Sequence, residues 1–174
     1  MAPTIRPEQP DDLAAIREVN LQAFARDGQA GTGEADLVNA LRSNGKSRLS
    51  LVAELDGLVI GHVMFSDVTV ASPSATHTIL GLAPLAVLPE YQKQGVGSAL
   101  MHASIDECRR MGAKAIFLLG HPSYYPRFGF APARLRDMLY QNGRDSAMVL
   151  ELVPGGLEGV TGTVSFESEF DAFE

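Results

Sequence analysis

The sequence has a single cysteine, no long apolar run and no apolar leader, and each of these absences removes a class of protein. Cys108 alone cannot form an intramolecular disulfide, so a disulfide-stabilised scaffold is excluded. The longest apolar stretches, such as residues 79–88, are far shorter than the roughly 20 residues of a membrane-spanning helix. The N-terminal residues, MAPTIRPEQPDD, contain no apolar core of a secretory signal. We therefore expect a cytoplasmic protein with no membrane partner.

Basic residues are also scarce. The chain carries 14 Lys and Arg against 21 Asp and Glu, which gives a formal net charge of −7. Nonspecific nucleic-acid binding normally requires a basic face, and no basic cluster here is dense enough to provide one. An acidic surface mildly favours a cationic substrate such as an amine, although the simpler interpretation is that the charge maintains solubility. We expect no nucleic-acid partner.

Length and composition describe an ordinary globular chain. The 174 residues fit one domain, with 45% hydrophobic and 20% charged residues. We find no internal repeat, low-complexity tract or linker, so we expect residues 1–174 to form a single domain. The four histidines, His62, His77, His102 and His121, lack the spacing of metal ligands such as HExxH, so we expect no metal site.

Hydrophobic periodicity and turn residues predict a mixed α/β or α+β fold, because some neighbouring strands have no crossover helix between them. Pro84 lacks a backbone N–H, so the pairing of its strand should be broken or bulged nearby. In the first half of the chain we predict an extended start at residues 4–6, a helix capped by Asp11 or Asp12, a loop at 26–33, a helix from Glu34 to about Asn44, and strands at 49–55, 58–70 and 78–87. In the second half we predict a helix at 97–111, a strand at 115–119, a short helix or turn at 122–128, and strands at 147–153 and 160–166, of which the last is a candidate edge strand.

Two glycines, Gly95 and Gly97, stand just before the strongest predicted helix. Such residues let the backbone turn tightly and point successive N–H groups outward, and the helix N-terminus adds unsatisfied donors and partial positive charge. Together these features can bind a pyrophosphate, or the glycines can serve only as a tight turn. The sequence contains no Walker motif, and Leu100 occupies the place of the third glycine of a Rossmann motif.

The residues around these glycines resemble a known family. Residues 92–97, Q-K-Q-G-V-G, resemble the Q/R-x-x-G-x-G/A acetyl-CoA signature of the GCN5-related N-acetyltransferase (GNAT) superfamily, and residues 124–130 resemble its Y-x-x-x-G-F segment. Together with the tail that contains residues 160–166, this segment is similar to a bacterial subgroup of predicted, YhbS-like acetyltransferases. The resemblance implies the acyl-CoA N-acyltransferase fold: a seven-stranded mixed sheet, flanked by helices, that splays open around acetyl-CoA. It covers a core from about residue 4 to 152, followed by a strand and tail at 153–174.

The resemblance also implies which residues hold the cosubstrate acetyl-CoA. Backbone groups of the splayed strand would bind the pantetheine arm, and N–H groups of the glycine loop would bind the pyrophosphate. The strand residues are Leu85, Ala86 and Val87, and the loop residues are Gln92, Lys93, Gln94, Gly95, Val96, Gly97 and Ser98. Tyr125 matches the family tyrosine near the coenzyme sulfur, so it is assigned as general acid and as a cofactor contact, with Tyr124 as the alternative.

The general base is left open by the sequence. Many members of the superfamily place a glutamate near the splayed strand, but residues 78–87 contain no acidic residue. Glu34 is a candidate, although it can equally serve as a carboxylate that complements a helix dipole, and a chain of ordered water is an alternative. Asp67 and Glu90 are weaker candidates. Cys108 lies on the apolar face of its helix, which argues against a covalent acetyl-cysteine mechanism.

The predicted function is an acetyl-CoA-dependent N-acetyltransferase that transfers acetyl directly to a primary amine of an unidentified small molecule or peptide. The alternative is a coenzyme A-binding sensor or scaffold without chemistry, and a weaker one is a nucleotide binder that uses the same glycine loop. In such folds residues 26–48 and 134–144 set acceptor specificity. Relatives are often dimers, so a homodimer is a further expectation.

Overall fold

The computed structural model describes residues 2–143 and 146–173. Its α-helices are α1 Leu13–Ala23, α2 Thr32–Ser43 and α3 Val96–Arg110. The strands are β1 Thr4–Pro7, β2 Leu49–Leu55, β3 Leu58–Ala71, β4 Thr76–Val87, β5 Ala115–Leu119, β6 Ala131–Pro132, β7 Met138–Tyr140, β8 Ala147–Glu151 and β9 Gly162–Ser165. Short 3-10 turns are η1 Pro10–Asp12, η2 Pro89–Tyr91, η3 Tyr125–Phe128, η4 Ala133–Arg136 and η5 Ser168–Ala172.

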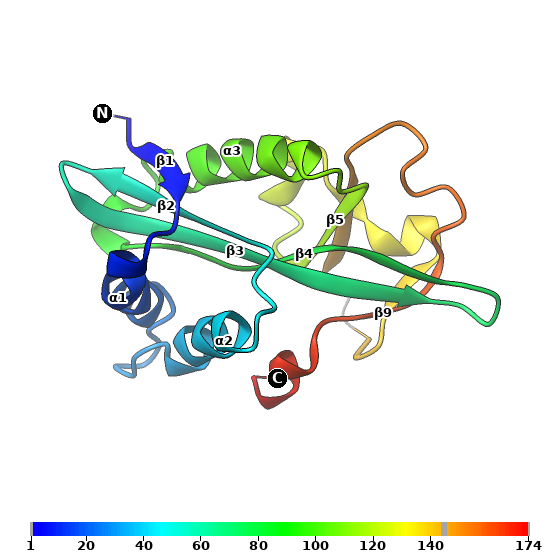
Figure 1. The fold of residues 1–174 in the computed structure, drawn as a ribbon, viewed down its shortest axis with the longest axis horizontal. Coiled ribbons are helices and arrows are strands. Elements are labelled where there is room, and N and C mark those ends of the chain that lie inside the picture. Colours follow the sequence, from blue (N-terminus) through cyan, green and yellow to red (C-terminus); the bar gives the residue numbers. More distant parts are fainter. Residues whose placement is uncertain (1, 144–145, 174) are drawn as a thin grey trace.

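All described strands join one mixed sheet. The sheet has nine strands, two more than the seven implied by the family resemblance: the order is β1-β2-β3-β4-β5-β8-β6, with β9 paired to β3 and to β7 off this path. Most neighbours are antiparallel, whereas β4 and β5 run parallel, as do β7 and β9. Strands β2 and β5 have the predicted bounds, and a turn at Asp56 and Gly57 joins β2 to β3. The helices lie on both faces, with α1 and α2 on one side and α3 on the other (Figure 1).

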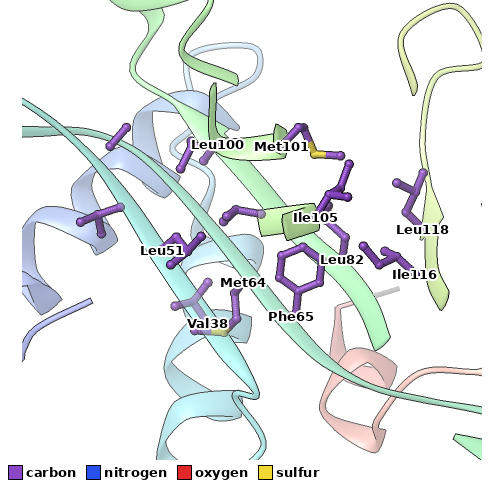
Figure 2. Packing of buried hydrophobic residues seen from close by; sticks show 14 of the residues in the cluster. Val38, Leu51, Met64, Phe65, Leu82, Leu100, Met101, Ile105, Ile116 and Leu118 are labelled. Carbon is purple, nitrogen blue, oxygen red and sulfur yellow. The ribbon is translucent and has the colours of Figure 1, made fainter. Parts of the chain in front are cut away.

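The main core fills the space between the sheet and its helices. Helix α3 contributes a stripe of apolar side chains at helical spacing, including Leu100, Met101 and Ile105, which are at most 6% exposed. These residues belong to one buried cluster with Phe65 of β3 and Ile116 of β5 (Figure 2). Burial of this face therefore sets how α3 is oriented against the sheet.

The C-terminal residues belong to the sheet. Strand β9 pairs with β3 on one side and with β7 on the other, and the side chain of Val164 is fully buried. The expectation that this strand lies at a sheet edge is therefore wrong. Strand β7, which is only three residues long and was not predicted, covers it. After β9 the chain continues into η5, which packs beside α2 (Figure 1).

The sheet opens between β4 and β5. Strand β4 pairs with β3 along its length, but it pairs with β5 only at Leu80–Ile116 and Gly81–Phe117. Beyond Gly81, the β5 side of β4 has no strand partner in the described part of the chain. Pro84 lies in this open stretch, and the β3–β4 register shifts between Val63 and Phe65, opposite the proline. The predicted irregularity at Pro84 is confirmed as a bulge beside the splay.

Candidate active site

The glycine loop connects the end of β4 to the start of α3. Gly95 has φ = +89°, a left-handed conformation in which L side chains are strained, and it caps the N-terminus of α3. Lys93 also has a positive φ, of 61°. Two side-chain amides brace the loop: Gln92 donates to the Val87 carbonyl oxygen at 2.9 Å, and Gln94 donates to the Glu90 carbonyl oxygen at 2.8 Å. The loop is therefore held in one shape before any ligand binds.

The backbone of this loop presents a row of free donors. For the N–H groups of residues 93–98, the described part of the chain supplies no hydrogen-bond acceptor. Gln92 differs from the predicted pattern because its N–H donates to the Pro89 carbonyl oxygen at 3.3 Å. Successive free N–H groups at a helix N-terminus, with the partial positive charge of the helix dipole behind them, form an anion-binding concavity. The donor row therefore suits a diphosphate.

The open edge of β4 offers further backbone groups. The Leu88 N–H donates to the Ile60 carbonyl oxygen of β3 at 2.9 Å. Because peptide groups alternate direction along a strand, Ala86 also faces β3, whereas Leu85 and Val87 face the splay. The Val87 carbonyl already accepts from Gln92. Of the three predicted strand residues, Leu85 and the Val87 N–H are thus directed at the cleft, and Ala86 is not.

Two tyrosines after β5 reach different parts of this region. A Cβ placed on Gly97 would lie 3.1 Å from the Tyr124 hydroxyl and 4.0 Å from Val87, so these three residues meet at the N-terminus of α3. Tyr125 instead lines a pocket of about 640 Å³ together with Leu85. Burial raises the pKa of Tyr125 to about 12. Its hydroxyl therefore keeps its proton at neutral pH and can act as a donor.

The same pocket contains the first base candidate. Glu34, near the N-terminus of α2, lines it together with Tyr125, and its half-buried carboxylate makes no ion pair with the described residues. Helix α2 begins at Thr32, two residues before the predicted start, so Glu34 lies in its first turn, where a carboxylate also complements the helix dipole. The structure thus brings residues 34, 85 and 125 together from three separate segments.

The other two base candidates, Asp67 and Glu90, lie elsewhere, and neither His121 nor Cys108 lines this pocket. Asp67 forms an ion pair with Arg48 at 3.1 Å and lines a different cavity of about 470 Å³. Glu90 is exposed in η2, and its backbone carbonyl oxygen accepts the hydrogen bond from the Gln94 side chain. His121 is exposed, and its carbonyl accepts the Tyr124 N–H in the turn before η3. Burial raises the pKa of Cys108 to about 12, and its side chain is fully buried, so this thiol is a core residue.

Sequence reasoning missed one wall of the pocket. Phe166, Phe170 and Phe173 line it from the C-terminal end of the chain. Residues 26–37, part of the predicted specificity region, also contribute, whereas residues 134–143 do not, and residue 144 lies outside the described residues. No α-helix places these rings, since Phe166 follows β9 and η5 is a short 3-10 turn. The signal that could have indicated the wall is the concentration of three phenylalanines within residues 166–173.

Comparison with known proteins agrees with this geometry. A family model described as the acetyltransferase (GNAT) family matches residues 13–130, which include the splayed strand, the glycine loop and both tyrosines. The chain belongs to the acetyltransferase (GNAT) family. This membership confirms the resemblance carried by the glycine loop. The mixed α/β sheet, open between β4 and β5, is accordingly a GNAT fold.

Two Escherichia coli (strain K12) proteins of this family are similar in sequence. The uncharacterized N-acetyltransferase YhbS is 38% identical over 172 residues, which cover 97% of this chain and 99% of YhbS. The uncharacterized N-acetyltransferase YjhQ is 42% identical over 123 residues, or 70% of this chain. The aligned part spans 65% of YjhQ, slightly less than two thirds of its length.

Two solved GNAT structures are similar along nearly the whole chain. The structure of Escherichia coli YhbS in complex with CoA superposes with a TM-score of 0.89 at 34% identity, covering 100% of this chain and 94% of that one. A GNAT family acetyltransferase from Brucella melitensis in complex with acetyl-CoA gives 0.79 at 35% identity, covering 97% of both chains. These similarities extend to the C-terminal strand that the family model does not match.

Two further features concern metals and membranes. In the part of the chain that the structure describes, no three His, Cys, Asp or Glu side chains gather closely enough to hold a metal ion. Across residues 2–143 and 146–173, no helix combines the length and apolar character needed to cross a bilayer.

Proposed function

We propose that this GNAT protein is an N-acetyltransferase that moves acetyl directly from acetyl-CoA to a primary amine of a small molecule or peptide. The observation that carries the proposal is the row of free N–H groups at residues 93–98, next to a strand whose edge is unpaired. Diphosphate and an extended amide-bearing arm are the chemistry that such donors and such an edge bind. Two similar structures that contain CoA or acetyl-CoA support it.

The residues of this chain fit acetyl-CoA in two parts. The N–H groups of the loop would hold the diphosphate, and Lys93 would add positive charge at its rim. Leu85 and the Val87 N–H would bond the pantetheine arm as an added strand. When bound, acetyl-CoA supplies the activated acetyl thioester. The loop residues in this proposal are Lys93, Gln94, Gly95, Val96, Gly97 and Ser98, and Gln92 contributes by bracing them through its side chain.

The chemistry requires a donor for the acetyl oxygen and a proton for the sulfur. A strand N–H of Leu85 or Val87 would stabilise negative charge that develops on the acetyl oxygen. Tyr125 would hold a proton on its hydroxyl and donate it to the departing sulfur. Tyr124 would instead help to shape the diphosphate site, because its hydroxyl lies beside Gly97.

The amine must lose its charge before it can react. Glu34 lines the pocket with Tyr125 and would orient the ammonium group and accept its proton, directly or through ordered water. In the balanced reaction, the amine nitrogen forms a bond to the acetyl carbon as the carbon–sulfur bond breaks. The ammonium gives up two protons, one of which ends on the sulfur and the other in solvent, leaving an amide and a free thiol.

The test is direct. Purified protein is titrated with coenzyme A by calorimetry, and acetyl-CoA turnover with an amine panel is followed by the free thiol released. We expect saturable binding and amine-dependent thiol release. Binding without turnover on any amine, with no effect of changing Tyr125, would favour a coenzyme A-binding sensor. Absence of binding, or equal competition by ATP, would refute the proposal. The homodimer and the cytoplasmic location stay predictions.

A further inference from the structure

The pocket beside Tyr125 has an aromatic wall made by the C-terminal segment. Phe166, Phe170 and Phe173 line it, and the rings of Phe166 and Phe170 stack with their centroids 4.4 Å apart. A Cβ placed on Gly33 would lie 3.2 Å from the Phe173 ring, so this ring closes onto the start of α2. The segment follows the last residue, 130, matched by the family model. The wall therefore lies outside the part of the chain that the family model matches.

Charged contacts hold this wall in place. Lys46, just after α2, forms ion pairs with Glu167 at 2.9 Å and with Glu169 at 3.0 Å. The Asn44 side chain donates to Glu169 at 2.6 Å, and Phe170, the next residue along the chain, is only 4% exposed. The end of the chain is thus anchored to the C-terminal end of α2, and the aromatic rings have a defined position at the pocket.

The charges at the pocket restrict what can bind there. Among the described residues that line it, Glu34 is the one acidic side chain and Arg26 the one basic side chain. Aromatic faces beside one carboxylate suit a single ammonium group joined to an apolar body. A polyamine or an aminoglycoside carries several ammonium groups. In this pocket only one of them would find a carboxylate, that of Glu34, and Arg26 would repel the others. A volume of about 640 Å³ is large enough for a small arylalkyl group.

We infer that the acceptor is a primary monoamine with an aromatic body, whose ring packs against the wall formed by Phe166, Phe170 and Phe173 while its amine lies near Glu34 and Tyr125. This inference rests on the proposed acetyl transfer and names its substrate class. The reaction is the balanced transfer given above, with the arylalkylammonium as the amine. Its products are an N-acetyl arylalkylamine, free coenzyme A and one proton.

The experiment compares acceptors on the full-length protein. Acetyl-CoA is held at saturation, and thiol release is measured with 2-phenylethylamine and tyramine against spermidine and kanamycin. We expect kcat/KM for 2-phenylethylamine to exceed that for spermidine by about tenfold or more, since each 1.4 kcal/mol of differential binding gives a factor of ten. Equal values, or a preference for spermidine or kanamycin, would overturn the inference while leaving acetyl transfer intact.

A variant then tests the wall itself. Phe173→Ala removes a ring that is 40% exposed, so the fold should tolerate the change. We expect KM for 2-phenylethylamine to rise about tenfold with KM for acetyl-CoA unchanged, and Leu135→Ala, at a 71% exposed position outside the pocket lining, to alter neither. An unchanged amine KM in Phe173→Ala would overturn the inference. Failure to bind coenzyme A, or silence with every amine, would overturn the proposed function as well.

Discussion

The side-chain amide of Gln92 donates a 2.9 Å hydrogen bond to the carbonyl oxygen of Val87, the last residue of β4. This contact joins the glycine loop to the splayed strand. The two parts of the proposed coenzyme site, a row of N–H groups and a strand edge, therefore keep a fixed spacing. A ligand that spans both parts meets a preorganised surface and loses less free energy to ordering the loop.

Replacing Gln92 tests this brace. Gln92→Ala removes a hydrogen bond worth about 1 kcal/mol, which corresponds to roughly fivefold in a dissociation constant. We expect the Kd for coenzyme A, measured by calorimetry, to rise by about that factor while the melting temperature changes little. Gln22→Ala, which changes an exposed glutamine of α1, serves as the control. Equal affinities in the two variants would show that the brace does not contribute to binding.

Gly95 provides a second test, of backbone conformation. At φ = +89°, alanine in place of Gly95 would be strained by about 1 to 2 kcal/mol, and relief of that strain would re-aim the N–H row. Gly112→Ala carries similar strain at φ = +83°, at the opposite end of α3. Both variants should be destabilised in urea unfolding, but only Gly95→Ala should bind coenzyme A at least tenfold more weakly. The interpretation fails if both bind like the parent protein.

Tyr125→Phe separates proton donation from packing. The ring and its edge contact with Phe130, at 5.9 Å between centroids, are retained, and only the hydroxyl is lost. General acid catalysis typically contributes 10² to 10⁴ in rate, so we expect kcat to fall about 100-fold with little change in KM for acetyl-CoA.

Tyr124→Phe is the matched variant for this test. The Tyr124 hydroxyl lies at the loop beside Gly97, so its removal should affect KM for acetyl-CoA more than kcat. The reverse pattern, with kcat lost in Tyr124→Phe and retained in Tyr125→Phe, would exchange the two assignments.

A buried histidine predicts how stability depends on pH. Asn20 donates to His62 Nδ1 at 3.2 Å, and His62 Nε2 lies 2.9 Å from the Ser50 hydroxyl, which donates to Glu8. Burial lowers the pKa of His62 from 6.5 to about 3, although the charge of Glu8 raises it and that of Arg42 lowers it further. Between these two pKa values the unfolded chain binds more protons than the folded one. The contribution of neutral, buried His62 to the free energy of unfolding is therefore fully present above pH 6.5 and is lost as the pH falls toward 3.

The decline has a definite size. One proton of difference changes the free energy of unfolding by at most about 1.4 kcal/mol per pH unit. We expect this slope to add to the acid limb of urea unfolding measured between pH 6 and 4. His62→Gln should lower overall stability but flatten that limb, because the titrating group is gone. If the free energies of unfolding of the variant and the parent protein fall in parallel between pH 6 and 4, His62 does not cause the loss of stability in acid.

Much of the fold follows from local patterns. The strands β2 and β5 were predicted with their observed bounds, because an alternating or continuous apolar run between turn residues specifies a strand. Helix α3 begins one residue before its predicted start and ends one residue before its predicted end, since Met111 follows the last helical residue and is 38% exposed. Strands β6 and β7, of two and three residues, are too short to leave a pattern and exist only because β8 and β9 pair with them.

The sequence by itself determined the glycine loop, the helix behind it and the family, because φ, turn chemistry and periodicity depend on neighbouring residues. Only the tertiary structure decided that Glu34, Tyr125 and Phe170, from three distant segments, line one pocket, and that Ala86 turns its peptide groups away from the cleft. The shared pocket exists because β4 and β5 separate after Gly81. The direction of the Ala86 peptide groups follows from the register of β4 against β3. Such long-range pairing is set by packing of the whole chain, which no local pattern encodes.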